Sequence, residues 1–91
     1  MSFHVIITSD LEKTLRVLKR KDKKTFLKLK KKMIQIAQCD SETISHYKNL
    51  KGALKAYKRV HIGSQVLIFR VKEDTIVFEV FDHHDNVYKI K

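Results

Sequence analysis

Three strand-like segments follow one another closely in the chain: Tyr57-Lys58-Arg59-Val60-His61-Ile62, then Gln65–Lys72 and Thr75–Phe81. Each of the three pieces is rich in β-branched and aromatic residues, and only Gly63-Ser64 and Glu73-Asp74 separate them. Connections this short are typical of hairpin turns, which join antiparallel neighbours. The stretch therefore predicts a three-stranded antiparallel meander.

Before the meander, the pattern predicts a strand and a helix. Phe3–Thr8 is short and rich in β-branched apolar residues, which suits a strand. Ser9 stands three residues before Glu12, the spacing of a capping box. The leucines that follow recur at a helical spacing: Leu11, Leu15 and Leu18. We therefore expect a first helix capped by Ser9.

A second helix is predicted after Asp22, which is a favourable N-cap residue. Its apolar stripe would consist of Phe26, Leu29, Met33 and Ile36, with lysines facing water. Residues 40–45 break this pattern and predict a loop or short turn. The order β-α-α-β-β-β predicts a single α+β domain over 1–91, with the N-terminal strand and helical hairpin packed on a small antiparallel sheet.

The charge balance points to a polyanionic partner. Twenty lysines and arginines against ten acidic residues give a formal net charge of +10. Nucleic acid is the first partner class that such a balance favours, and an acidic protein is the second. No apolar run approaches the roughly 20 residues of a membrane span. The single Cys39 fits a reducing compartment. We therefore expect a cytoplasmic protein without a membrane partner.

Titratable side chains gather after the last predicted strand, in Asp82-His83-His84-Asp85. Imidazole, with an ordinary pKa of about 6.5, can both take and give a proton near neutrality. Adjacent histidines in extended backbone point to opposite sides, so only one of the two can join a given site. A metal site is disfavoured because neighbouring ligands seldom converge on one ion. We expect no metal and no cofactor.

The C-terminal half resembles the RelE/ParE superfamily of toxins, and most closely the YafQ-type branch of RelE-like endoribonucleases. The blocks that carry the resemblance are Asn49-Leu50-Lys51-Gly52, Tyr57–Ile62, Val66–Val71 and His83–Tyr88. The resemblance implies a toxin of a type II toxin–antitoxin system that cleaves mRNA, commonly on the ribosome, through the 2′-hydroxyl of the RNA and histidine acid–base catalysis. Its partners would be an acidic antitoxin, mRNA and ribosomal RNA.

The same resemblance implies the site residues. It places His61, His84 and Tyr88 at the catalytic centre, with Lys48 where that branch often has another histidine. His46 lies two residues earlier and is the alternative for that role. Asp82 and His83 are secondary candidates. The lysines expected to bind RNA are Lys24, Lys28, Lys31, Lys48 and Lys58.

Two positions depart from the family pattern. Arginines usually stand near Val66 and Val80, and both positions are apolar here. The missing cation would then come from Lys58, Arg59 or Lys48. We favour Arg59, because period-two alternation puts it on the same face as His61. The departures also favour an alternative function, a non-catalytic binding module. Such a module would be a gyrase-type toxin acting on a protein, or an RNA-binding protein.

Overall fold

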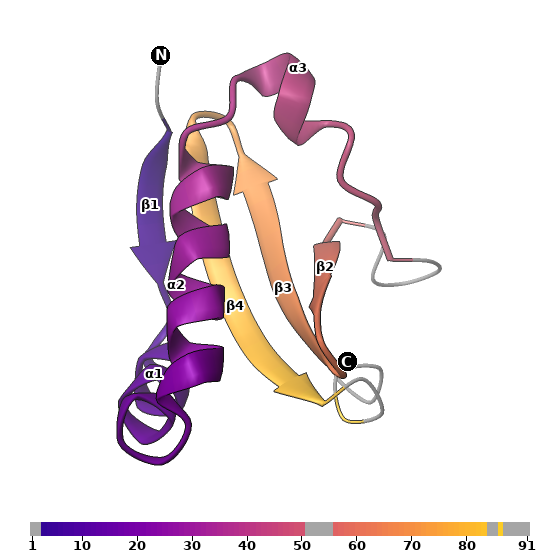
Figure 1. Ribbon diagram of the computed structural model, residues 1–91. Helices are drawn as coiled ribbons and strands as arrows, with labels where there is room; N and C mark the ends of the chain where they lie inside the picture. The colour runs from indigo at the N-terminus through magenta and orange to yellow at the C-terminus, as the bar shows by residue number, and fades with distance from the viewer. Residues whose placement is uncertain (1–2, 51–55, 84–85, 87–91) are drawn as a thin grey trace.

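Four strands form one sheet in the order β1-β4-β3-β2 (Figure 1). The computed structural model describes residues 3–50, 56–83 and 86. Its elements, in chain order, are β1 (His4–Ile7), α1 (Ser9–Lys21), α2 (Lys23–Ala37), α3 (Ser41–Ile44), β2 (Lys58–Ile62), β3 (Gln65–Lys72) and β4 (Thr75–His83). The predicted α+β architecture is confirmed. Among the described residues, no helix is long and apolar enough to cross a membrane.

The predicted meander is present, since β2 pairs with β3 and β3 with β4 in antiparallel register. Its two turns are those expected, and Gly63 and Glu73 take positive φ values of 64° and 57° there. A glycine adopts this conformation without strain, whereas a glutamate does so at some cost. β1 adds to the outer side of β4 in parallel, which makes the four-stranded sheet mixed.

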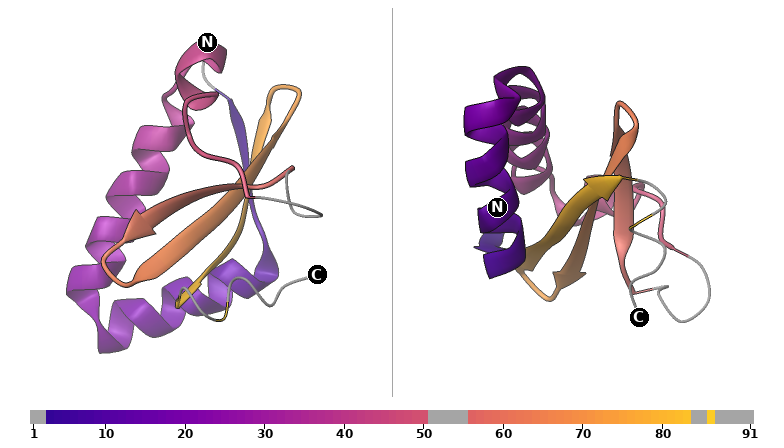
Figure 2. Two further views of the ribbon diagram at one scale, coloured as in Figure 1. Left: turned by 90° about the vertical axis from the view of Figure 1, so that its right-hand side faces the viewer. Right: turned by 90° about the horizontal axis from the view of Figure 1, so that it is seen from below.

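The helical hairpin covers one face of the sheet (Figure 2). The core between the two layers contains Leu11 of α1 and the α2 stripe at Leu29, Met33 and Ile36. The sheet contributes Leu67, Phe69, Ile76, Phe78 and Phe81 to the same cluster. The helical spacing of the apolar residues thus identified the buried stripe, except that Phe26 is only half-buried.

Thr8, not Ser9, caps α1. The Thr8 side-chain oxygen accepts a hydrogen bond from the Leu11 amide (3.2 Å) and donates one to the Glu79 carbonyl of β4 (2.6 Å). Ser9 is already the first helical residue, so the expected cap was wrong by one position. The contact with β4 is the physical reason, because only the Thr8 hydroxyl both caps the helix and reaches the sheet.

The other helix starts follow local chemistry. Asp22 caps α2 by accepting from the Thr25 amide (3.2 Å), as expected. Residues 40–45 hold a one-turn helix, α3, which Asp40 caps through the Thr43 amide (2.7 Å). Hydrogen bonds from these threonines lower the pKa of Asp22 and of Asp40. The expected short turn at 40–45 therefore has helical geometry.

Candidate functional site

Cross-strand register aligns the candidate residues in rows on the sheet face opposite the helices. His61, Val66 and Asp82 are partners across β2, β3 and β4 and form the first row. Arg59, Ile68 and Val80 form the second row in the same way. Residues paired directly across strands project to the same side, with Cβ atoms about 4.5–5.5 Å apart. This surface, the open face, therefore carries His61 and Arg59 together.

The alternation predicted for β2 agrees with this placement. Val60 and Ile62 pack against the core beneath the helices, so the residues between them project to the open face. His61 is exposed, and Arg59 is half-buried. A histidine and a permanent cation thus stand two residues apart, about 6–7 Å along the strand, which is close enough to act on one phosphodiester.

The positions where arginines are missing lie in a second apolar cluster. Val66 and Ile68 are buried on the open face together with Leu50, and Tyr57 and Val80 pack against them. Leu50 approaches through a backbone hydrogen bond from its amide to the Tyr57 carbonyl (2.9 Å). Val66 and Val80 thus have a packing role, and the centre of the open face is apolar where a cation was expected.

Sequence reasoning did not single out Arg70, which lies on this open face. Its Nε donates to the Glu79 carboxylate at 2.7 Å, and its guanidinium carbon lies 6.0 Å from the centre of the Tyr57 ring. The available signal was the alternation Val66, Ile68, Arg70 along β3. Glu79 is the extra residue at a register shift between β3 and β4, which brings it to this arginine.

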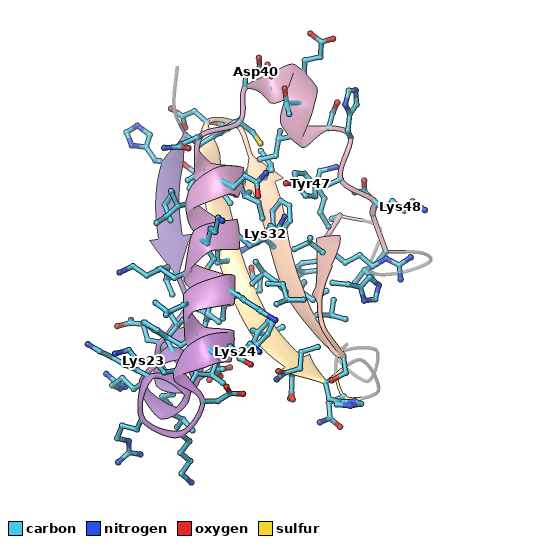
Figure 3. The ribbon with its side chains drawn as sticks, viewed as in Figure 1. Lys23, Lys24, Lys32, Asp40, Tyr47 and Lys48 are labelled. Atoms are coloured by element: carbon cyan, nitrogen blue, oxygen red, sulfur yellow. The ribbon has the colours of Figure 1, made fainter. Side chains whose placement is uncertain are left out.

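Two of the predicted RNA-binding lysines lie at the outer edge of β2. The Lys58 ammonium donates to the Tyr47 carbonyl (3.2 Å) and to the Asn49 side chain (2.9 Å), which anchors the segment beyond α3. Lys48 is exposed (Figure 3). Its carbonyl accepts a hydrogen bond from the Arg59 amide (3.0 Å), so the backbones of the two residues lie side by side. His46 is exposed and directly follows α3.

The last strand is longer than expected and contains Asp82 and His83. Asp82 is half-buried, and its carboxylate accepts from the His83 amide (2.7 Å) and the Asn86 side chain (3.4 Å). His83 pairs with Gln65, so it projects to the side opposite Asp82. His84 and Tyr88 lie outside the described residues. The strand ends two positions after Phe81, directly before His84.

The predicted lysines of α2 are exposed, and two of them line the same groove as His61. Lys28 and Lys31 line a groove with His61 and Ile62 at the edge of β2. Lys24 lies one turn earlier on the same helix (Figure 3). Among residues 3–50, 56–83 and 86, no three His, Cys, Asp or Glu side chains gather in a way that could hold a metal ion.

Known proteins of similar sequence exist in two archaea. A protein of Methanocaldococcus jannaschii, named as the candidate toxin RelE4, is 45% identical over 92 residues, which cover 98% of this chain and 94% of the relative. An uncharacterised protein of Methanosarcina mazei is 36% identical over 87 residues, which cover 90% of this chain and 94% of the relative. No protein-family model matches the chain.

Solved structures share the fold at low sequence identity. The Staphylococcus aureus YoeB dimer matches with a TM-score of 0.73 at 14% identity over 92% of this chain and 99% of its own. Escherichia coli YafQ matches with a TM-score of 0.65 at 15% identity over 94% and 98%. The toxin–antitoxin complex RelBE2 of Mycobacterium tuberculosis matches with a TM-score of 0.66 at 19% identity, and the match covers 92% of this chain and 100% of the matched chain. Because a relative with 45% identity spans nearly the whole chain, the protein belongs to the RelE family of toxins.

Proposed function

We propose that this chain is the toxin of a type II toxin–antitoxin system and a metal-independent endoribonuclease that cleaves mRNA in the cytoplasm. The observation that carries the proposal is the open face, where register places His61 and Arg59 side by side on an edge strand. Asp82 completes the row of His61, two residues before His84 in the sequence. Membership of the RelE family, which the relative with 45% identity over nearly the whole chain shows, supports the same function.

The chemistry uses a nucleophile that RNA already contains. A base takes the proton of the 2′-hydroxyl, the 2′-oxygen attacks the phosphorus, and the 5′-oxygen leaves with a proton from an acid. The products are a 2′,3′-cyclic phosphate and a 5′-hydroxyl. His61 and His84 are the proposed acid and base, a type of catalysis worth about 10²–10⁴ in rate. Arg59 would stabilise the phosphoryl oxygens, and Tyr88 would stack on an unpaired base.

The test is a cleavage assay with an end-labelled single-stranded RNA, both free and on programmed ribosomes. We expect 2′,3′-cyclic or 3′-phosphate ends and no inhibition by EDTA. His61→Gln and His84→Gln should each slow cleavage at least about 10²-fold. His4→Gln is the matched control, because His4 is an exposed histidine on the opposite edge strand. Cleavage that chelation abolishes and a divalent ion restores would contradict the mechanism, and so would wild-type activity of both site variants.

The partners proposed for this chain are a cognate acidic antitoxin, mRNA and ribosomal RNA. Structural neighbours include the antitoxin complexes DinJ–YafQ of Escherichia coli and RelBE2. The net charge of +10 is complementary to an acidic protein and to RNA alike. An antitoxin can therefore compete with the RNA substrate for the same positively charged protein surface.

One observation favours the rival function of a non-catalytic binding module. Val66 and Val80 fill the centre of the open face with apolar contacts instead of cations. Without those cations the face offers less stabilisation of the charge that develops on a phosphoryl group, which favours binding without cleavage, either of a protein, as by a gyrase-type toxin, or of RNA. Growth arrest that survives His61→Gln and His84→Gln, without RNA cleavage, would select this rival.

A further inference from the structure

The two flanks of α2 differ in chemistry. The flank towards β1 borders an apolar groove that includes Phe26, Met33 and Ile34. The flank towards β2 borders a second groove of about 470 Å³, called here the basic groove. Its lining residues are Lys28, Lys31, Lys32, Gln35, His61 and Ile62. His61 is the residue that the basic groove shares with the open face.

The helical residues of the basic groove form one stripe. Positions 28, 31, 32 and 35 have the spacing i, i+3, i+4, i+7, so their side chains project to the same side of α2. The stripe spans about 10 Å along the helix axis at ~1.5 Å per residue. Lys32 is half-buried, while Lys28 and Lys31 are exposed. Figure 3 shows Lys24 and Lys32 projecting from the same helix.

Within α2 itself no carboxylate balances these lysines, although the N-cap Asp22, whose pKa the Thr25 hydrogen bonds and also Lys24 and Lys28 help to lower, lies close enough to act on Lys28. The helix contains no aspartate or glutamate between Lys23 and Ala37. Lys32 Nζ donates to the Gln35 amide oxygen at 3.0 Å, and this acceptor carries no charge. The ion pairs His4–Asp74 and Arg70–Glu79, which join described residues, both lie away from α2. Like charges at these spacings destabilise an isolated helix by a few tenths of a kcal/mol per pair. An anionic ligand would relieve that repulsion.

We infer that the basic groove is a phosphate-binding subsite for the substrate strand flanking the scissile bond. The strand would leave the open face at His61, pass around the edge of β2 and run along Lys28, Lys31 and Lys32. Lysine ammonium groups are point charges that suit the RNA backbone and not base edges, so the subsite adds affinity without sequence preference. This inference rests on the proposed ribonuclease function, but its binding test does not require cleavage.

The binding test uses a 2′-O-methyl RNA 12-mer, which lacks the nucleophilic hydroxyl and is not cut. Affinity is measured against KCl concentration for wild type and for the variant Lys28→Gln/Lys31→Gln/Lys32→Gln. Each phosphate contact contributes about −0.7 to the log–log slope for single strands, so the slope should flatten by roughly 2. Affinity near 0.1 M salt should fall about 10²-fold.

The matched control removes the same charge from a different basic cluster. Lys13, Arg16 and Lys19 lie together on α1, where no candidate catalytic residue lines their surface. Lys13→Gln/Arg16→Gln/Lys19→Gln should change the slope by less than half as much as the groove variant. Equal effects of the two variants would reduce the groove to general electrostatic attraction and overturn the subsite. A groove variant that weakens ribosome binding but leaves 12-mer binding intact would also overturn it.

A cleavage comparison separates this inference from the proposed function. The ratio of kcat/KM for a cleavable 12-mer to that for a dinucleotide should fall at least about tenfold in the groove variant. An unchanged ratio would overturn the subsite while leaving the nuclease assignment standing. Conversely, wild-type protein that cleaves neither substrate refutes the nuclease assignment. A flattened slope in the binding test would then still support the groove as a phosphate site.

Discussion

We propose that Arg59 supplies the cation that the apolar residues Val66 and Val80 do not. It occupies the same cross-strand row as Val80, with Ile68 between them, and stands two residues from His61. Adjacent strands lie about 4.8 Å apart, so a guanidinium on Arg59 can cover part of the distance to the position above Val80. A guanidinium holds two phosphoryl oxygens at once, whereas an ammonium does not.

We therefore predict that Arg59→Lys lowers the single-turnover cleavage rate by roughly 10²–10³-fold. Arg70→Lys is the matched control, because Arg70 shares the open face but lies about 13 Å from the His61 row along β3 at ~3.3 Å per residue. It should leave the rate within a few-fold of wild type. If Arg70→Lys were the crippled variant, the phosphate would lie at the Tyr57 end of the face.

Lys58→Ala completes this comparison at a neighbouring residue. The Lys58 ammonium is engaged with the Tyr47 carbonyl and Asn49, so its loss should lower stability by about 1 kcal/mol. The cleavage rate of the folded variant should stay near wild type. A folded Lys58→Ala protein with a crippled rate, beside an active Arg59→Lys protein, would make Lys58 the phosphate clamp.

Thr8 connects three elements of the fold, namely β1, α1 and β4. The residue directly follows β1, and its hydroxyl caps α1 and donates a hydrogen bond to the Glu79 carbonyl of β4. We predict that Thr8→Val lowers the free energy of unfolding by about 1–2 kcal/mol, because it removes a cap and leaves a half-buried carbonyl without its donor. Urea denaturation measures the change.

Ser9→Ala is the control for this prediction, since Ser9 is the cap that the capping-box spacing indicated. It should change stability by less than about 0.5 kcal/mol, as is usual for exposed substitutions. Thr8→Ser keeps the hydroxyl and should recover most of the loss. A larger cost for Ser9→Ala than for Thr8→Val would restore the original assignment of the cap.

The difference between Thr8 and Ser9 shows which parts of this fold local sequence determines. Strands β2 to β4 were predictable because alternation and two-residue turns are local signals. The helix cap was not, because two hydroxyl residues stand side by side and a carbonyl 71 positions away decides between them. The parallel pairing of β1 with β4 is likewise a long-range contact that no local pattern encodes.

The candidate site likewise contains some residues that the sequence could place and others that it could not. Alternation placed Arg59 and His61 on one face, and the structure agrees because the register is fixed by the buried residues on the other face. That His61 and the lysine stripe of α2 line the same groove was not predictable, because it depends on how the helix lies across the sheet. Arg70 was overlooked although its alternation was visible, because its partner Glu79 arrives through a register shift.

The two flanks of α2 present different surfaces across the molecule, one basic and one apolar. The basic groove lies next to His61, whereas the apolar groove lies between α2 and β1. The apolar groove has a volume of about 360 Å³. Three of its lining residues are exposed apolar side chains, Val5, Ile7 and Ile34, and the exposed fraction of Ile34 is 50%. β1 is also an edge strand of the sheet, which can accept a further strand from a partner.

We propose that an apolar segment of the acidic antitoxin occupies this groove. Lys30 lines the groove itself, and the net charge of +10 favours an acidic occupant. Ile34→Asp should then weaken antitoxin binding roughly tenfold or more, because it removes an apolar contact worth about 1.5–3 kcal/mol when fully buried and adds a like charge.

Leu27→Asp is the matched control on the same helix. Leu27 is exposed to 52%, close to the value for Ile34, but does not line the groove. The measurement is co-expression of each variant with the cognate antitoxin, sought as a small acidic protein encoded beside this gene, followed by titration of the purified pair. We expect that protein to relieve growth arrest by wild type and Leu27→Asp but not by Ile34→Asp. Equal relief of both variants would place the antitoxin elsewhere, and the exposed residues of β1 and α2 would then need another partner.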